Sequence, residues 1–283
     1  MSRARQLRRL LQQHDIVVAP GAYDAISARA IAQAGFEAVY MTGSGTAAAR
    51  GFPDFGLLTM TEMADNAGII ARSVELPVIS DADTGYGSEL NITRTVREFE
   101  SRQVAAIHIE DQVDPKRCGH LEDKAVVSTE DFLVRIRAAL HARRDPDFMI
   151  IARTDARAVH GLDDAIDRVN AALGAGADMA FVEAPQTLAE LEEVPARVRG
   201  PCLLNLVVGG KSPVFSVDEA AQMGYRMMIV PGALFRAAMA RFDEVLAELR
   251  DTGRPPPQAA TVKEGFQRFD ADAWAALRSK FKS

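Results

Sequence analysis

Residues 78–111 read VISDADTGYGSELNITRTVREFESRQVAAIHIED, and they contain the unit that repeats along the chain. Two short apolar runs, 78–81 and 105–110, flank a longer segment with a helical pattern. Such an alternation predicts two parallel strands joined by a crossover helix. Both apolar runs end in acidic residues, so we expect the carboxyl ends of these strands to carry polar side chains.

The same rhythm recurs along the chain and predicts eight strands. Several of them are apolar on both faces, as strands covered on both sides by helices must be. They span residues 16–20, 38–42, 78–81, 105–110, 149–153, 179–183, 203–207 and 227–230. No Pro-, Gly- or Ser-rich linker separates these units. The pattern therefore favours a single α/β domain over residues 1–250, a closed (β/α)₈ barrel of the TIM type, over an open doubly wound sheet.

Three segments extend this barrel. A predicted N-terminal helix precedes the first strand, a long lid loop covers about residues 113–127, and a tail covers residues 251–283. The tail includes three consecutive prolines at 255–257, followed by an apolar face formed by Phe266, Phe269, Trp274, Leu277 and Phe281. We expect a helical tail whose apolar face packs on a neighbouring subunit or, equally, on its own barrel.

Composition and charge narrow the classes of partner. The 283 residues include 39 acidic and 33 basic side chains, a formal net charge of −6, with no block of like charge. This distribution argues against nucleic acid. The two cysteines, Cys118 and Cys202, form no CxxC pair, which argues against a disulfide framework and a structural zinc site. Without a secretion signal or an apolar run approaching roughly 20 residues, we expect a cytoplasmic protein with no membrane partner.

Polar side chains follow most of the predicted strands, at the end where barrel enzymes place their active sites. They include Thr42, Asp81, Asp83, Glu110, Arg153, Glu183 and Asn205. A single strand-end Asp usually caps a turn or a helix. Several carboxylates at one barrel end, without a cage of Cys or His, instead indicate Mg²⁺, or Mn²⁺, held by oxygen ligands.

Lysine placement bears on the alternative of Schiff-base catalysis, which needs a lysine that projects from a strand into the site. All lysines lie in predicted loops or in the tail: Lys116, Lys124, Lys211, Lys263, Lys280 and Lys282. We therefore expect a metal ion, acting as a Lewis acid, to stabilise negative charge during catalysis.

The lid loop contains Lys116-Arg117-Cys118-Gly119-His120, which places a thiol between cationic groups. A lone cysteine in a basic loop commonly has no role. Beside an acidic barrel site, Cys118 is better explained as an acid or base that reaches the substrate when the lid closes. The neighbouring cations predict that this thiol exchanges a proton near neutral pH.

Two glycine-containing segments suggest phosphate ligands. Residues 43–48, GSGTAA, match the dinucleotide pattern GxGxxA, but Gly51 and Pro53 interrupt the helix that should follow, which disfavours a nucleotide. Gly209-Gly210-Lys211 follows the seventh strand, where many barrels bind phosphate. The same residues are equally explained as a glycine turn with a solvated lysine. A phosphorylated substrate therefore remains one of two alternatives for this segment.

These motifs resemble the isocitrate lyase and phosphoenolpyruvate mutase superfamily. The resemblance is strongest to its short lyase branch of 2-methylisocitrate lyases, 2,3-dimethylmalate lyases and petal-death-type proteins. It covers nearly the whole chain and rests on the KxCGH of residues 116–120, the DxD of Asp81 and Asp83, and the HIED of residues 108–111. It implies a barrel, Mg²⁺ and a homotetramer that exchanges C-terminal helices between subunits.

The resemblance also implies roles for individual residues. Metal-binding positions are Asp81, Asp83 and, through water, Glu110. Substrate-binding positions are Thr42, Gly43, Ser44, Gly119, His120, Arg153, Glu183 and Asn205. Asp54 and His108 match positions behind these groups, and Cys118 matches the proposed general acid. Tyr40 is our candidate base, and Arg153 offers positive charge to the reacting groups.

We therefore predict an Mg²⁺-dependent carbon–carbon lyase for a small carboxylate. It would cleave a 2-hydroxy di- or tricarboxylate, of the 2-methylisocitrate or 2,3-dialkylmalate type, into a 2-keto acid and a carboxylate. Leu121-Glu122-Asp123 after the lid motif suits a tricarboxylate poorly, and residues 209–211 look more like dialkylmalate lyases and oxaloacetate hydrolases. The alternatives are an oxaloacetate hydrolase or decarboxylase, a phosphonomutase and a non-catalytic barrel that binds a dicarboxylate.

Overall fold

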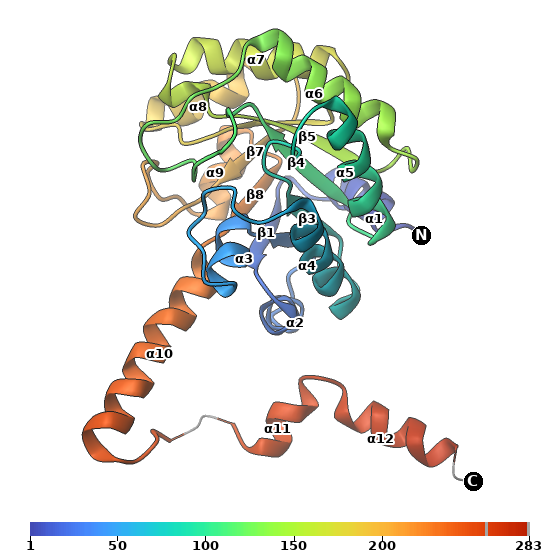
Figure 1. Cartoon of the computed structure of the whole chain (residues 1–283), viewed down its shortest axis with the longest axis vertical. Helices are drawn as coiled ribbons and strands as arrows, with labels where there is room; N and C mark the ends of the chain where they lie inside the picture. The colour runs from blue at the N-terminus through green and yellow to red at the C-terminus, as the bar shows by residue number, and fades with distance from the viewer. Residues whose placement is uncertain (258–259, 282–283) are drawn as a thin grey trace. The chain divides into compact units, whose positions relative to one another are not determined.

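The computed structural model describes residues 1–257 and 260–281 and contains a closed barrel of eight parallel strands (Figure 1). The strands are β1 (Val17–Ala22), β2 (Val39–Met41), β3 (Val78–Asp81), β4 (Ala106–Glu110), β5 (Met149–Thr154), β6 (Met179–Val182), β7 (Cys202–Asn205) and β8 (Met227–Val230). They follow one another in sequence order, and β1 closes the ring by pairing with β8, with Val17 opposite Met227. The predicted (β/α)₈ barrel is confirmed.

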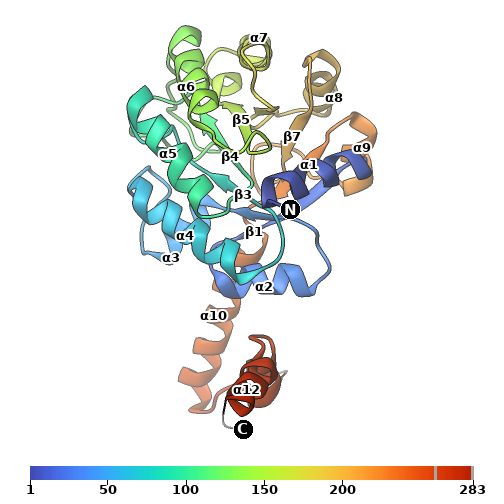
Figure 2. The same ribbon diagram turned by 90° about the vertical axis from the view of Figure 1, so that its right-hand side faces the viewer.

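Helices alternate with the strands and surround them (Figure 2). They are α2 (Ala25–Gln33), α4 (Met60–Ser73), α5 (Glu89–Ser101), α6 (Thr129–Ala142), α7 (Leu162–Gly174), α8 (Leu188–Arg197) and α9 (Val217–Met223). Two short helices, α3 (Gly43–Ala49) and η1 (Ala156–Ala158), follow β2 and β5. Hydroxyl side chains begin several of these helices; Thr59 and Ser216, for example, form capping boxes with Glu62 and Glu219.

Alternate residues of each strand belong to different apolar layers, because side chains of a strand point to opposite faces. On β5, Met149 and Ile151 belong to a cluster inside the barrel. Ile150 and Ala152 instead join a cluster that also contains helix residues such as those of α4 and α6. The barrel is therefore filled by side chains and covered by helices, as its fold class requires.

The predicted N-terminal helix is α1 (Arg3–Gln13), and it caps one end of the barrel. Its residues Leu7 and Leu10 are buried in the interior cluster. Arg226, which directly precedes β8, donates from Nη2 to the backbone carbonyl of Leu11 at 2.6 Å. This contact places α1 at the amino ends of the strands, and the opposite end is left for the site.

The chain consists of two compact units, Met1–Phe235 and Arg236–Ser283. The second unit holds most of α10 (Ala233–Thr252), together with α11 (Val262–Gln267) and α12 (Ala271–Lys280), which confirms the helical extension. Large apolar side chains of this unit are exposed, among them Phe242, Leu246, Val262, Phe266 and Trp274. Among the described residues, no helix has the length and apolarity to cross a bilayer.

Candidate active site

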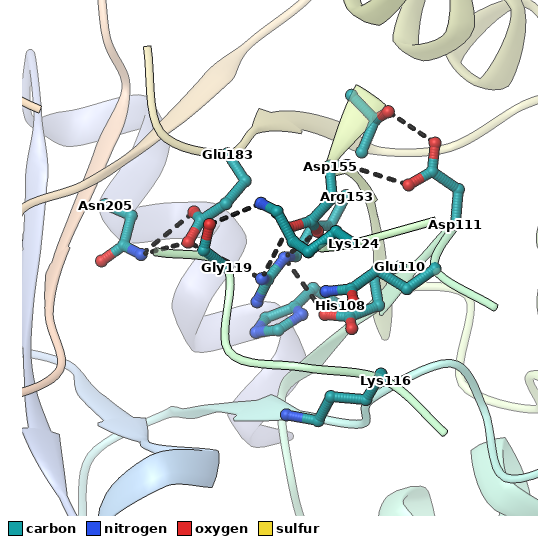
Figure 3. Close-up of polar contacts among 12 residues, drawn as sticks. His108, Glu110, Asp111, Lys116, Gly119, Lys124, Arg153, Asp155, Glu183 and Asn205 are labelled. Atoms are coloured by element: carbon teal, nitrogen blue, oxygen red, sulfur yellow. Dashed lines mark hydrogen bonds and ion pairs between the residues drawn. The ribbon is translucent and has the colours of Figure 1, made fainter. Parts of the chain in front are cut away.

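The strand-end residues predicted from the sequence lie at the carboxyl ends of the strands, and Figure 3 shows four of them, Glu110, Arg153, Glu183 and Asn205. β3 ends at Asp81, β4 supplies Glu110, and β5 supplies Arg153. Glu183 directly follows β6, and Asn205 ends β7. All except the half-buried Asn205 are buried, so the cluster forms a charged layer inside the protein rather than a solvated surface.

Arg153 is the centre of this layer. Its Nε lies 3.1 Å from Oε2 of Glu110 and 3.0 Å from Oδ2 of Asp155, and its Nη2 lies 3.6 Å from Oε1 of Glu183. Asn205 Nδ2 donates to Oε2 of Glu183 at 3.1 Å. Burial opposes the charge, but Asp155, Glu110 and Glu183 raise the pKa of Arg153 well above its usual value. The guanidinium is therefore a permanent positive charge that could bind a carboxylate.

The three predicted metal ligands come from the ends of β3 and β4, and Glu110 contacts Arg153. The backbone N–H of Asp83 donates to Oδ1 of Asp81 at 3.0 Å, and Asp83 itself has a left-handed backbone with φ of 46°. Burial raises the pKa of Asp83 to about 6 and the pKa of Glu110 well above its usual value. Negative charge is thus costly here without more positive charge nearby.

Buried carboxylate oxygens with few partners mark the place where a divalent cation could bind. Oε1 of Glu110 is buried without a hydrogen-bond donor. Oε2 of Glu110 and Oδ1 of Asp83 make no hydrogen bond beyond their ion pairs with Arg153 and Lys116. Within residues 1–257 and 260–281, no three His, Cys, Asp or Glu side chains form a ready-made metal cage. Carboxylates with spare oxygens suit Mg²⁺, which keeps several waters and substrate oxygens instead of a complete protein cage.

Lys116 is a site residue that the sequence did not predict. We placed it in a loop, yet its side chain is 3 % exposed and its Nζ forms ion pairs with Asp54 and, at 2.8 Å, with Oδ1 of Asp83. Burial opposes its charge, but Asp83, Asp54 and Asp81 raise the pKa of Lys116 well above its usual value. Its amine is therefore held as an ammonium and is unsuited to act as a nucleophile, which agrees with the exclusion of Schiff-base chemistry.

Tyr40 and His108 form a buried pair below the charged layer. The Tyr40 hydroxyl lies 2.9 Å from Nε2 of His108, and the two rings are stacked with their centroids 5.8 Å apart. Burial and Arg153 lower the pKa of His108 well below its usual value. Burial and Asp81 raise the pKa of Tyr40 well above its usual value. Tyr40 is thus a neutral phenol at neutral pH and could act as a base only by passing its own proton to a partner such as His108.

The β2 loop lies against the same layer. Thr42 begins α3, where its hydroxyl accepts from the Gly45 amide at 3.3 Å and lies 3.0 Å from the hydroxyl of Ser44. A Cβ atom on Gly43 would lie 2.2 Å from Oδ2 of Asp81, so only glycine allows this approach. The predicted substrate-binding segment is therefore next to the predicted metal ligands.

The predicted lid is the loop between β4 and α6. Its two ends pair with each other, because Val113 N–H donates to the Ala125 carbonyl at 2.9 Å and Val127 N–H to the Asp111 carbonyl at 2.8 Å. A Cβ atom on Gly119 would lie 2.1 Å from Oε1 of Glu183 and 2.6 Å from Nη2 of Arg153. The lid backbone therefore lies directly on the charged layer.

His120 connects the lid to the segment after β7. Lys211 N–H donates to Nδ1 of His120 at 3.1 Å, and a Cβ atom on Gly210 would lie 2.7 Å from the same nitrogen. Since Nδ1 accepts this bond, the ring proton is on Nε2, 3.5 Å from Oε1 of Glu183. The glycine turn at residues 209–211 thus holds a lid residue, a role that the sequence did not suggest.

Our expectation for the Cys118 thiol was wrong. We predicted proton exchange near neutral pH from the cations beside it in the sequence. Burial and Asp54 instead raise the pKa of Cys118 to about 11, with Glu183 adding to the effect. The thiol therefore keeps its proton at neutral pH, which suits a proton donor and excludes a standing thiolate.

The fold and these contacts define the class of protein: a barrel enzyme with a carboxylate-rich site at the carboxyl ends of its strands. The family profile described as phosphoenolpyruvate phosphomutase matches residues 7–250. The chain belongs to this family, within the phosphoenolpyruvate mutase/isocitrate lyase superfamily.

Named relatives support the lyase branch. A 2-methylisocitrate lyase of Aeropyrum pernix is 45 % identical over 87 % of this chain and 80 % of its own length. A solved 2,3-dimethylmalate lyase is 41 % identical, with a TM-score of 0.94 over 99 % of this chain and 95 % of its own. A solved oxaloacetate acetylhydrolase is 40 % identical, with a TM-score of 0.96 over 100 % of this chain and 98 % of its own. The prediction that the chain is an enzyme of the lyase class is thereby confirmed.

One further solved relative bears on the metal. A phosphonopyruvate hydrolase in complex with oxalate and Mg²⁺ is 29 % identical, with a TM-score of 0.89 over 100 % of both chains. It provides an example of a superfamily structure that contains Mg²⁺ together with a dicarboxylate.

Proposed function

We propose that this chain is an Mg²⁺-dependent carbon–carbon lyase that cleaves a 2-hydroxy di- or tricarboxylate of the 2-methylisocitrate or 2,3-dialkylmalate type. The products would be a 2-keto acid and a carboxylate. One observation carries this proposal: the Cys-Gly-His segment of the lid lies directly on the Arg153–Glu183 pair. Cys118 directly precedes Gly119 in this segment, so its protonated thiol begins next to the charged layer that can bind the substrate.

Asp81, Asp83 and Glu110 are the residues that would hold the cation, directly or through water. When bound, Mg²⁺, or Mn²⁺ in its place, would act as a Lewis acid on the 2-oxygen and one carboxylate of the substrate. The buried Oε1 of Glu110, which lacks a hydrogen-bond donor, and the relative solved with Mg²⁺ support this assignment.

The remaining steps belong to the side chains. Tyr40 would accept the proton of the 2-hydroxyl group while passing its own phenol proton to Nε2 of His108, 2.9 Å away. The bond between C2 and C3 would then break to give the 2-keto acid. The electron pair of that bond stays on the other fragment, and Cys118 would protonate it to complete the carboxylate product. Arg153, His120 Nε2 and Asn205 would bind the substrate carboxylates.

A panel of substrates tests the proposal. The rate of keto-acid release should be measured with 2-methylisocitrate, 2,3-dimethylmalate and oxaloacetate at saturating Mg²⁺. We expect the highest kcat/KM with one of the 2-hydroxy acids. Faster turnover of oxaloacetate, which the likeness to oxaloacetate acetylhydrolase makes the second candidate, would transfer the assignment to that reaction.

We also propose a homotetramer in which the tail contacts a neighbouring subunit. The exposed apolar side chains of α11 and α12, such as Phe266 and Trp274, support this idea, because exposed patches of this kind commonly mark interfaces. Truncation before Thr261 should lower the mass measured by light scattering to that of smaller species. An unchanged mass would contradict the proposal.

A further inference from the structure

Lys124 lies near the end of the lid, and its side chain is buried, unlike most lysines in loops. Only 1 % of its side chain is exposed. Its Nζ donates to the backbone carbonyl of Gly119, five residues earlier, and lies 2.8 Å from Oδ1 of Asp155 (Figure 3). A buried ammonium is stable only when its charge and donors are matched, so these two contacts account for its position.

Gly119 is the middle residue of the Cys-Gly-His segment, and it has little freedom to move. The space next to its backbone is occupied by Glu183 Oε1 and Arg153 Nη2. Because Cys118 and His120 are joined to Gly119 by single peptide bonds, the position of this backbone fixes where both side chains begin. A bond to the Gly119 carbonyl therefore acts on both of them.

Asp155, the partner of Lys124, is anchored in the barrel. Its backbone N–H donates to Oδ1 of Asp111 at 2.8 Å, and the neighbouring Thr154 hydroxyl donates to Oδ2 of Asp111 at 2.6 Å. The same Asp155 carboxylate binds Arg153. Burial alone would raise the pKa of Asp155, but Arg153 and Lys124 lower it to about 2, so this carboxylate is charged at neutral pH.

We propose that Lys124 is a positioning residue that docks the Cys-Gly-His segment onto Asp155 and thereby onto Arg153. Its ammonium joins the lid backbone to the carboxyl end of β5, and Cys118 and His120 are held in one arrangement above the charged layer. Lys124 touches no substrate in this account. The catalytic part of the inference rests on the proposed lyase function, whereas the docking of the lid does not.

The reactivity of the two cysteines provides a direct test. Cys118 lies in the docked segment, and Cys202 lies in β7 within a separate apolar cluster. Loss of docking should expose Cys118 alone, whereas general unfolding should expose both. The rate of iodoacetamide labelling at each cysteine, followed by peptide mass spectrometry, therefore separates the two effects.

The variants are Lys124→Met, which removes the charge at similar length, and Lys124→Arg, which keeps it. We expect Lys124→Met to label Cys118 at least about tenfold faster with Cys202 unchanged, and Lys124→Arg to lie in between. Asp155→Asn removes the partner charge and should act like Lys124→Met, which keeps the test available should Lys124→Met not fold. Unchanged labelling of Cys118 in the folded variants, or equal acceleration at Cys202, would overturn the proposal.

Glu122→Gln is the matched control. Glu122 also pairs with a lysine, Lys211, at 2.7 Å, but its side chain is 81 % exposed. Exposed ion pairs contribute little, so labelling of Cys118 should change by less than about twofold. An effect equal to that of Lys124→Met would mean that any lid charge matters and would overturn the specific role of Lys124.

Kinetics distinguish positioning from a merely structural role. With a substrate identified by the panel above, Lys124→Met should lower kcat about 10- to 100-fold and change KM by less than about threefold, since small displacements of catalytic groups cost rate. Lys124→Arg should recover part of kcat. A larger effect on KM than on kcat would contradict the proposal. The labelling experiment needs no substrate. If the lyase assignment fails, cysteine labelling therefore still shows whether Lys124 docks the lid.

Discussion

The interior of the barrel changes character within two residues along the same face of a strand. On β5, Ile151 belongs to the apolar interior, whereas Arg153, the next residue on that face, is the centre of the ionic layer. β6 repeats the change, with Phe181 in the apolar interior and Glu183 in the ionic layer. The side chain of Phe181 even lies at the boundary, with its ring centroid 5.1 Å from the Arg153 guanidinium.

These two layers contribute differently to the protein. Burial of apolar side chains stabilises the fold, whereas burial of charged groups costs free energy that pairing only partly offsets. A deeply buried ionic layer is therefore a poor source of stability and is better explained by chemistry. We call the apolar interior, with Ile151 and Phe181, the lower layer, and the ionic layer, with Arg153 and Glu183, the upper layer. Changes in the lower layer should reduce the stability of the fold, and changes in the upper layer should reduce turnover.

Removal of divalent cations is expected to have the largest effect and to act on the upper layer alone. Excess chelator should abolish keto-acid release, and added Mg²⁺ should restore it, because Asp81, Asp83 and Glu110 would lose the cation they hold. The Tm should fall by only a few degrees, since the apolar interior is unchanged. Full turnover in excess chelator, or a substrate adduct trapped by borohydride, would contradict the metal-centred account.

Ile151→Ala tests the lower layer. Removing this fully buried side chain should lower the free energy of unfolding by about 2–5 kcal/mol, as measured by urea denaturation. Turnover per folded molecule should remain within about twofold of the unaltered protein. Glu183→Gln is the matched change in the upper layer, and its loss of kcat/KM should exceed its loss of stability. The reverse pattern in this pair would refute the division into two layers.

The smallest expected effect is the pH dependence of the rate at which iodoacetamide labels Cys118. Because burial raises the pKa of Cys118 to about 11, the thiolate fraction should increase about tenfold per pH unit through pH 9 and 10. A plateau near pH 9 would show an ordinary exposed thiol and contradict the docked lid. Cys202, whose pKa burial raises to about 12, provides the reference for unfolding in the same samples.

The barrel and the position of its charged residues were largely predictable from the sequence, because apolar runs alternate with helical segments and polar residues stand at the ends of those runs. Short apolar runs predict buried parallel strands, and the carboxyl ends of such strands meet at one end of a barrel. The meeting of Asp81, Glu110, Arg153 and Glu183 therefore follows from topology. The expected strand at 203–207 was less accurate, because β7 ends at Asn205 and Leu206 begins the loop toward the glycine turn.

The lid was not predictable in the same way, because its contacts come from chain segments far away in sequence. Lys116 and Lys124 stand in a polar loop, where lysines are normally solvated, yet both pair with buried acids from other loops. The cations beside Cys118 in the sequence suggested a low pKa, but burial and the spatial neighbour Asp54 decide the opposite. The burial of these lysines and the raised pKa of Cys118 depend on the folded structure and could not be predicted from residues adjacent in sequence.

If the enzyme is a lyase whose lid delivers the proton, replacement of Cys118 by Ala should remove that proton donor. The steady-state kcat for the best 2-hydroxy acid should fall about 10²- to 10⁴-fold, the usual contribution of a general acid, with the Kd of Mg²⁺ nearly unchanged. Any decarboxylation of oxaloacetate should fall much less, since it does not need this proton transfer. If Cys118→Ala cleaves the 2-hydroxy acid within about twofold of the unaltered rate, as expected of a loop residue without a chemical role, the lyase account is contradicted.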